Sequence, residues 1–575
     1  MESISNAYES FVYNLSLKDY ILRLLVLGTR QNKYDQHAKQ LTADDMAYIQ
    51  AQIKAGHGEE ILNIVKEVYK ESRAPKFDNT FLVLAMLCKA ENSYVKRLSL
   101  AALANFRTIS HLYMWKNFHA GILNPESGEK SKGFGRAVKR EINNWILSYR
   151  YKPLDLAYQI TKYQAREGWS FKNILQCTHV CTKTGDNRIF EKSEKRKSPN
   201  PHNVAPTEFD LVLRYAVNGL DAMVDLEGSL PPLSPVYTYL RAVNFTKHCT
   251  EDDKAELIHL VYEHKLTREQ VPTWSLTDTD VLTALLCNKQ KTHITMPLNA
   301  LLRNLGNMTK HQVFADKEIV DIVRLHLTHH TIIKYSRIHP VTVLTAWFTY
   351  KKGMSNKGHN QWDPSPHIVA ALEEMFYLSF KNVEPTGKRI CFLIDSSGSM
   401  TGDSLCEGVS NAEAAALLAM IFARSETGEK DSPAHAFYLF TSKNTNGWGH
   451  GNTGLTDVSD VIDANAPLEN VLNAVQRSDW GSTDISMGIL EALKYKRKYD
   501  AFVVITDNDV NSGIKPAEAM RQYRQGLKIP QSKLVVVATK GTDITIADPT
   551  DPFMLDMCGF DSHGPKILQD FIRSA

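Results

Sequence analysis

The chain has 575 residues, with 67 Lys and Arg against 64 Asp and Glu and a formal net charge of +3. That length exceeds what one hydrophobic core serves and predicts several domains. No apolar run reaches the roughly 18 residues that a membrane span needs, and the first residues do not resemble a secretory signal. The composition therefore excludes a membrane-protein class, and we expect the cytoplasm, with the nucleus as the alternative compartment.

The charge is unevenly distributed along the chain. Residues 1–380 hold 48 basic and 39 acidic side chains, whereas residues 381–575 hold 19 and 25. A basic first part favours a polyanionic partner. The acidic second part indicates a module with a different purpose.

Residues 1–370 carry apolar side chains mainly at helical spacing. The segments 41–72 and 79–106 each read as helices joined by short turns. Many consecutive helices with almost no strand pattern predict a bundle or an α-solenoid of stacked helix pairs, although no clean repeat period is visible. The charged segment 187–203 interrupts this pattern and is predicted to be a loop. Its basic run, 195–197, either contacts a polyanion or is simply solvated.

From about residue 385 the pattern changes to apolar runs of strand length that alternate with helical segments. The predicted strands are 389–395, 434–440, 500–507 and 533–539, and the predicted helices are 411–424, 484–496 and 516–526. This alternation is typical of a parallel sheet covered by helices on both faces. The sequence therefore predicts an α/β, Rossmann-like domain over 385–575.

Oxygen-bearing side chains follow the first predicted strand of that domain. Asp395, Ser397 and Ser399 occupy alternate positions after it, Thr483 precedes a helix, and Asp507 ends another buried strand. Ligands of open α/β sheets bind at the carboxyl ends of the strands, and oxygen is the ligand type that a hard cation such as Mg²⁺ requires. The sequence predicts a divalent-cation site with an open coordination position that an acidic group of a protein partner can fill. The alternative is a Ser-rich turn without metal.

Three successive predicted helices in the first part each present a basic face. The helix in 133–150 buries an apolar stripe opposite its basic residues. A second predicted helix begins at Pro153 and aligns Gln159, Lys162 and Arg166 on one face, and after Gly168 a short third helix is capped by Ser170. The candidate RNA contacts are Arg136, Lys139, Arg140, Lys162, Arg166, Lys172 and His179. Stacked helices of this kind predict a cationic surface for phosphates, although a single helix of this kind is more often a solvated face.

The pattern Asp395-x-Ser397-x-Ser399, with Thr483 and Asp507 in later loops, resembles the metal-ion-dependent adhesion site of von Willebrand factor A domains. The whole chain resembles the Ro ribonucleoprotein family, in which a TROVE module precedes such a domain. The segments that carry this resemblance are "GRAVKREI", "ITKYQAREGWSFKNIL", "MPLNALLRNLGNMT", "IHPVTVLTAWFTYKKG", "VEPTGKR" and "DPFMLDMCGFD".

The resemblance implies a ring of HEAT-like helical hairpins over 1–370, followed by the A domain over 385–575. It implies Y RNA binding on the outer surface, with contacts at Lys162, Arg166 and His179, and entry of misfolded noncoding RNA ends into the central hole. Gln164 stands where the family has a further Lys.

Two functions follow as expectations. The first is a noncatalytic ribonucleoprotein core that binds Y RNA-like and misfolded noncoding RNAs in RNA quality control. The alternative is a metal-dependent adhesion scaffold whose A domain grips an acidic residue of a protein partner.

Overall fold

The computed structural model describes most of the chain. The described residues are 3–5, 11–13, 17–26, 33–35, 41, 43–71, 74, 77–122, 134–180, 207–220, 234–355, 360–396, 400, 410–425, 435–440, 454–462, 466–475, 484–506, 514–538, 546–548, 551–558 and 564–574. The chain divides into two compact units, one of Thr42–Met296 and one of Met1–Leu41 with Pro297–Ala575. Among the described helices, none combines the length and the apolar character that a membrane span requires.

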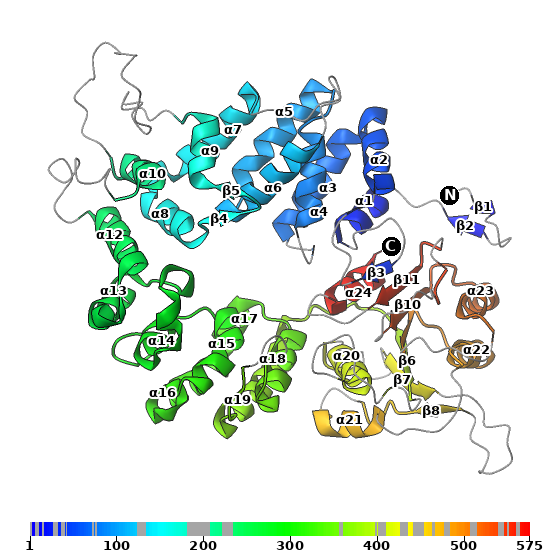
Figure 1. Ribbon diagram of the computed structural model, residues 1–575. Helices are drawn as coiled ribbons and strands as arrows, with labels where there is room; N and C mark the ends of the chain where they lie inside the picture. Colours follow the sequence, from blue (N-terminus) through cyan, green and yellow to red (C-terminus); the bar gives the residue numbers. More distant parts are fainter. Residues whose placement is uncertain are drawn as a thin grey trace. The chain divides into compact units, whose positions relative to one another are not determined.

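The unit Thr42–Met296 is built almost entirely of helices (Figure 1). Its α-helices are α2 (Ala43–Gln52), α3 (Gly58–Glu71), α4 (Asp78–Leu87), α5 (Ser93–Ala101), α6 (Ile109–Gly121), α7 (Arg136–Leu147), α8 (Pro153–Lys162), α9 (Phe171–Thr178), α10 (Glu208–Asn218), α12 (Pro235–His248), α13 (Lys254–His264) and α14 (Thr279–Leu286). Contacts join α3 to α4, α4 to α6, α5 to α7, α7 to α9, α8 to α10 and α12, and α13 to α14. The predicted stacking of neighbouring helices is thus confirmed.

Local chemistry sets the boundaries of these helices. Between α2 and α3, Gly56 has φ of 101°, a conformation that a residue with a side chain rarely adopts, and the helical path kinks there. Before α5, the side chain of Asn92 accepts hydrogen bonds from the backbone N–H of Tyr94 at 2.9 Å and of Val95 at 3.3 Å. This cap satisfies donors that have no partner within the helix.

The second unit begins with helices of the same kind. They are α1 (Leu17–Val26), α15 (Leu298–Lys310), α16 (Lys317–Leu327), α17 (His330–Ser336), α18 (Pro340–Lys352) and α19 (Pro366–Ser379). Proline occupies the first helical turn of α18 and α19, where its missing N–H costs nothing. The helical region thus extends to residue 379, and helices after Pro297 group with the sheet that follows them.

A mixed sheet forms the rest of this unit. Its described strands are β3 (Lys33–Asp35), β6 (Ile390–Asp395), β7 (His435–Phe440), β8 (Leu455–Asp457), β9 (Ala501–Thr506), β10 (Lys533–Ala538) and β11 (Met554–Cys558), in the order β3-β11-β10-β9-β6-β7-β8. All neighbours are parallel except β7 and β8. The four predicted strands are confirmed as β6, β7, β9 and β10. A separate hairpin pairs β1 (Ser3–Ser5) with β2 (Phe11–Tyr13).

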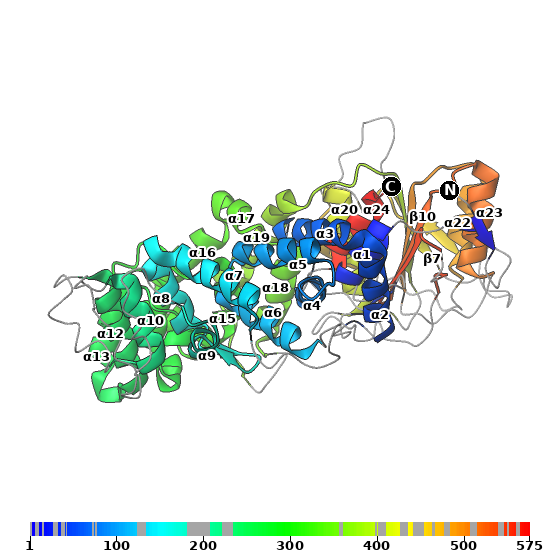
Figure 2. The same ribbon diagram turned by 90° about the horizontal axis from the view of Figure 1, so that it is seen from above.

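Helices cover both faces of the sheet (Figures 1 and 2). They are α20 (Asn411–Ser425), α21 (Leu468–Val475), α22 (Ser486–Lys494), α23 (Pro516–Leu527) and α24 (Gly564–Arg573). Cys391 and Leu393 of β6 share a core cluster with residues of α22 and α23, whereas the ring of Phe392 lies 4.9 Å from that of Phe422 in α20. Successive side chains of a strand point to opposite faces of the sheet. Since helices cover both faces here, β6 is buried along its whole length. This confirms the predicted α/β architecture.

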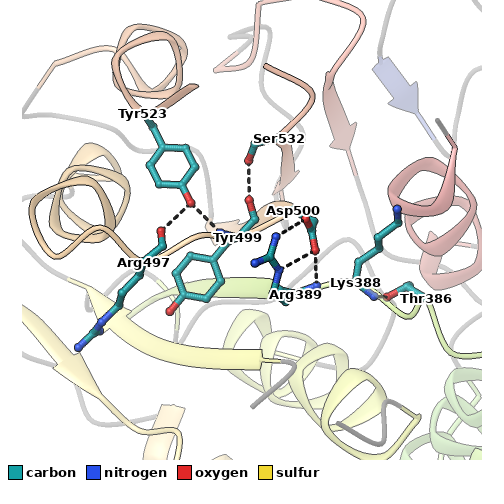
Figure 3. A network of polar contacts seen from close by, with 8 residues as sticks. All are labelled: Thr386, Lys388, Arg389, Arg497, Tyr499, Asp500, Tyr523 and Ser532. Atoms are coloured by element: carbon teal, nitrogen blue, oxygen red, sulfur yellow. Dashed lines mark hydrogen bonds and ion pairs between the residues drawn. The ribbon is translucent and has the colours of Figure 1, made fainter. Parts of the chain in front are cut away.

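A polar network fixes the amino-terminal ends of β6 and β9 (Figure 3). The guanidinium of Arg389 donates to both carboxylate oxygens of Asp500, from Nη2 at 2.8 Å and from Nε at 3.1 Å, and the Arg389 backbone N–H donates at 2.8 Å. Nearby, the Tyr523 hydroxyl accepts from the Tyr499 backbone N–H at 2.7 Å and donates to the Arg497 carbonyl at 2.8 Å. These contacts hold the two central strands in register.

Replacing Asp500 by Ala is expected to destabilise the protein by about 1–2 kcal/mol, because a bidentate pair and a backbone hydrogen bond are lost at a half-exposed position. Burial raises the pKa of Asp500, but the hydrogen bonds and charge of Arg389 outweigh it and hold this pKa below 3.8. The stabilisation is therefore complete above about pH 4 and is lost as the pH falls through the lowered value. Urea unfolding of wild type, Asp500→Ala and Asp500→Asn at pH 7 and pH 3 measures this. Equal differences at both pH values would contradict it.

Candidate functional sites

Helix α7 carries the first three predicted RNA-binding residues. Its apolar side chains Val138, Ile142, Trp145 and Ile146 are buried, as predicted, so the opposite side faces solvent. Arg136 and Arg140 are exposed, and Lys139 is half-buried. Arg140 pairs with the adjacent Glu141 at 2.7 Å, whereas Arg136 and Lys139 have no ion pair among the described residues. Two cationic groups of α7 are therefore available to an external anion.

Lys162, the last residue of α8, lies among tyrosine side chains. Its Nζ donates to the Tyr158 hydroxyl at 3.0 Å and lies 5.2 and 5.8 Å from the ring centroids of Tyr158 and Tyr163. Burial opposes the charged form, but the hydrogen bond to Tyr158 and the nearby charge of Glu269 outweigh it and raise the pKa of Lys162. Lys162 is thus a half-buried cation beside aromatic rings, in surroundings that favour its charged form. The sequence reading placed Tyr158 on the side of the helix away from Lys162 and missed this pair, although the i, i+4 spacing of the two residues could have indicated it.

The sequence placed Lys162 and Arg166 on one helix, and this alignment is wrong. Helix α8 ends at Lys162, and Arg166 lies in a hairpin of β4 (Ala165–Arg166) and β5 (Trp169–Ser170). Glu167 and Gly168 both have positive φ, 53° and 74°, which suits a two-residue hairpin turn and cannot continue a helix. Arg166 is exposed, with its guanidinium 5.9 Å from the Tyr163 ring centroid.

A buried lysine anchors this hairpin, and sequence reasoning missed it. Lys116 of α6 is 2% exposed, with its Nζ 4.2 Å from the Phe134 ring centroid and 5.1 Å from that of Trp169 in β5. Within the described residues, no carboxylate or hydrogen-bond acceptor contacts this ammonium. Burial lowers the pKa of Lys116 to about 8. The aromatic rings thus stabilise a desolvated charge.

The Lys116→Met variant tests this anchor. The folded pKa of about 8 lies below the ordinary value of 10.5, so the folded state disfavours the protonated form. The stability of the wild type is therefore expected to rise by about 2–3 kcal/mol, relative to Lys116→Met, as the pH goes from 7.5 to 10.5. Denaturant unfolding across this range measures the difference, and Met keeps a long, unbranched side chain without the charge. Parallel profiles of the two proteins would contradict a titrating buried lysine.

Helix α9 carries the last two predicted residues. Ser170 caps it as predicted, in a reciprocal capping box with Asn173. Lys172 is exposed near the start of the helix, and His179 is exposed at its end with φ of 51°. The Asn143 side chain of α7 donates to the Thr178 carbonyl at 3.3 Å, which ties the two helices together.

The structure places most of the predicted basic residues on neighbouring elements, and Lys162 lies at the end of α8, which contacts α10 and α12. Helix α7 contacts α9, β5 contacts α6 and α9, and β4 contacts α6. Figure 1 shows α7 beside α9, with the β4–β5 hairpin next to them. Each of α7, α8, the β4–β5 hairpin and α9 carries at least one exposed or half-exposed cation with no described ion pair. These cations are Arg136, Lys139, Lys162, Arg166 and Lys172.

The predicted cation site lies at the carboxyl end of the sheet. Asp395, the last residue of β6, is fully buried, and its Oδ2 accepts a hydrogen bond at 2.8 Å from Thr506 at the end of β9. The neighbouring Ser396 hydroxyl donates to the Phe440 carbonyl at 3.2 Å. The other predicted ligands lie outside the described residues: Ser397, Ser399, Thr483 and Asp507.

The described part of this site fits a hard cation. Asp395 contributes a buried carboxylate at the end of β6, and carboxylate oxygen is the ligand type that a hard cation requires. Asp507 directly follows Thr506, so the Asp395–Thr506 contact brings the ends of the two predicted ligand loops together. Within the described residues, no cluster of three His, Cys, Asp or Glu side chains could hold a metal. Three of the five predicted ligands are hydroxyls, so we expect a cation here to depend on hydroxyl ligands as well as carboxylates.

A stacked helical module, followed by a mixed sheet with Asp395 at its carboxyl end, defines a protein that joins a TROVE-type region to a von Willebrand factor A domain. Residues 389–572 match the family model of the Ro60 vWA domain, and residues 261–349 match that of the TROVE domain. The chain is 30% identical to the Caenorhabditis elegans RNA-binding protein RO60, over 99% of this chain and 90% of that protein. The chain therefore belongs to the Ro60 family.

Two comparisons with Deinococcus radiodurans agree with this assignment. The RNA-binding protein RO60 of that organism is 30% identical, over 99% of this chain and 95% of that protein. The crystal structure of the Deinococcus radiodurans RO (RSR) protein superposes with a TM-score of 0.77 at 29% identity, and covers 97% of this chain and 99% of that one.

Proposed function

We propose that this protein binds RNA through the basic side chains of α7, α8, the β4–β5 hairpin and α9. The observation that carries the proposal is the group of five cations on these elements that have no described ion pair: Arg136, Lys139, Lys162, Arg166 and Lys172. Cations without an ion pair contribute most to the free energy of phosphate binding. Their contact with phosphate releases the counterions of the nucleic acid and breaks no internal salt bridge. The relatives named RNA-binding protein RO60 support the same partner.

The RNAs proposed are small structured noncoding RNAs of the Y RNA type and the loose 3′ ends of misfolded noncoding RNAs. Folded RNA is recognised largely by its shape and its phosphates, and exposed bases stack on aromatic rings. Tyr158 and Tyr163 stand beside Lys162, and His179 is exposed at the end of α9, so bases and phosphates meet suitable groups on one part of the chain. The protein holds RNA without transforming it and acts in RNA quality control in the cytoplasm.

The A domain is proposed to bind Mg²⁺ at Asp395, Ser397, Ser399, Thr483 and Asp507. When bound, the cation supplies an open coordination position for an acidic group. Asp395 contributes the buried carboxylate, and Thr506 holds one of its oxygens. Adhesion to an acidic residue of a protein partner is the second candidate function, and it can coexist with RNA binding.

Ultraviolet crosslinking of the purified native protein, followed by sequencing of the bound RNA, tests the proposal. Small structured RNAs and fragments with single-stranded 3′ ends are expected to be enriched over an Arg136→Ala/Lys162→Ala/Arg166→Ala variant prepared in parallel. Equal recovery with both proteins would refute the surface. Recovery of acidic peptides in a Mg²⁺-dependent manner, with no RNA above background, would favour the adhesion function alone.

A further inference from the structure

A cavity of about 460 Å³ lies between α3, α4 and η2 (Ala102–Asn105) in the unit Thr42–Met296. Its walls are mainly apolar and include Val65, Phe81, Leu84 and Phe106. This volume lies within the range of pockets that hold small organic molecules. None of the predicted RNA-binding residues lines it.

The mouth of this cavity is cationic. Lys66, Lys70 and Arg107 line it and are exposed, and no Asp or Glu is among the lining residues. The guanidinium of Arg107 is held in place by the carbonyls of Tyr69 at 2.7 Å and Lys70 at 2.8 Å. Lys66 and Lys70 have no ion pair among the described residues. The rim therefore attracts an anionic group, whereas the interior excludes one.

Thr80 belongs to the apolar part of the cavity wall. It is 1% exposed, and its hydroxyl oxygen is itself buried. A ligand in the cavity therefore meets the apolar part of this side chain, and the charged groups open to a ligand are those of the rim.

The walls are held firmly before any ligand arrives. The Tyr69 hydroxyl accepts from the Arg107 backbone N–H at 2.9 Å and lies 2.8 Å from His111 Nδ1. The Tyr69 ring packs against those of Phe81 and Phe106, with centroids 5.6 and 6.1 Å away. A cavity with fixed walls loses little conformational entropy when it is filled.

We infer that this cavity binds a small amphiphilic anion, with its apolar ring or chain against the aromatic walls and its carboxylate or sulfonate at Lys66 and Lys70. A nucleobase fits less well, because it would bury several donors and acceptors against mainly apolar walls. The site is separate from the proposed RNA surface and goes beyond it. Phe106 links the two regions, since its carbonyl accepts from Trp145 Nε1 of α7 at 2.9 Å.

Fluorescence titration of the full chain with 8-anilinonaphthalene-1-sulfonate tests the site directly, with decanoate as the competitor. Saturable binding to one site, displaced by decanoate, is expected for the wild type. The Lys66→Gln/Lys70→Gln variant changes exposed side chains only and is expected to bind at least tenfold more weakly. The Lys265→Gln/Lys289→Gln variant removes the same charge from other exposed positions and is expected to bind as the wild type does.

A second variant tests the interior. Ala102→Leu adds three carbon atoms to the cavity wall and is expected to reduce probe binding at least tenfold; its melting temperature reports whether it folds. Unchanged probe affinity in the Lys66→Gln/Lys70→Gln variant would overturn the inference. Displacement of the probe by a short RNA but not by decanoate would replace the amphiphilic anion by a nucleotide. Because no RNA is needed for probe binding, failure here leaves the proposed function untouched.

Discussion

Replacing Lys162 and Arg166 together by Ala is expected to weaken RNA binding about 10- to 100-fold at 150 mM salt, and to reduce the slope of log K against log[salt] by about 1.4–1.8. Each residue supplies one positive charge with no described ion pair, so each is counted as one phosphate contact. Removing two contacts lowers the number of released counterions by two, and the slope follows that number.

The loss is not confined to charge. Lys162 holds the Tyr158 hydroxyl at 3.0 Å, and both Lys162 and Arg166 lie over the Tyr163 ring. Arg166→Lys keeps the charge but loses the planar guanidinium, so it is expected to keep the salt slope while weakening affinity a few-fold. This variant separates the electrostatic contribution from the geometric one.

Electrophoretic mobility shift or fluorescence anisotropy at four salt concentrations measures both quantities. Lys494→Ala/Lys498→Ala, which removes two exposed lysines of the A domain, is the matched control and is expected to bind as the wild type does. If the Lys162→Ala/Arg166→Ala variant kept the wild-type slope, RNA would have to bind elsewhere on the chain.

Most of the fold was predictable because its elements carry strong local signals. The strands β6, β9 and β10 are buried on both faces and read as unbroken apolar runs. Strand β3 was not predicted. It has three residues, one of them apolar, and it forms only because β11, far away in the sequence, offers a parallel edge. Pairing of this kind depends on tertiary structure and leaves no local pattern.

The candidate site was predictable in part for the same reason. The exposed face of α7 follows from the spacing of its buried residues, and the cap of α9 follows from Ser170 and Asn173. The end of α8 was not predicted, because the turn at Gly168 was read as the boundary of one longer helix. The Lys116 anchor depends on a contact between α6 and β5, and a single Lys in an apolar helix gives no sign of the rings that will surround it.

The second large effect is expected at Asp395. Mg²⁺ at tenfold excess over its dissociation constant is expected to stabilise the wild type by about 1.4 kcal/mol and to raise the A-domain melting temperature by about 3–5 °C. Asp395→Asn removes the charge but keeps an oxygen that accepts from Thr506, so it is expected to fold and to lose this Mg²⁺-dependent rise completely. Thermal unfolding with Mg²⁺ and with EDTA measures the difference.

Thr506→Val is the matched control for this experiment, because it removes the 2.8 Å hydrogen bond and leaves the carboxylate in place. It is expected to melt at a lower temperature than the wild type in EDTA and still to be stabilised by Mg²⁺. Without metal, Asp395→Asn keeps an acceptor for the Thr506 hydroxyl, so its melting temperature in EDTA is expected to lie close to that of the wild type. If Asp395→Asn were less stable than the wild type in EDTA and still stabilised by Mg²⁺, Asp395 would stabilise the sheet through its hydrogen bond to Thr506. Any bound cation would then be held by other residues.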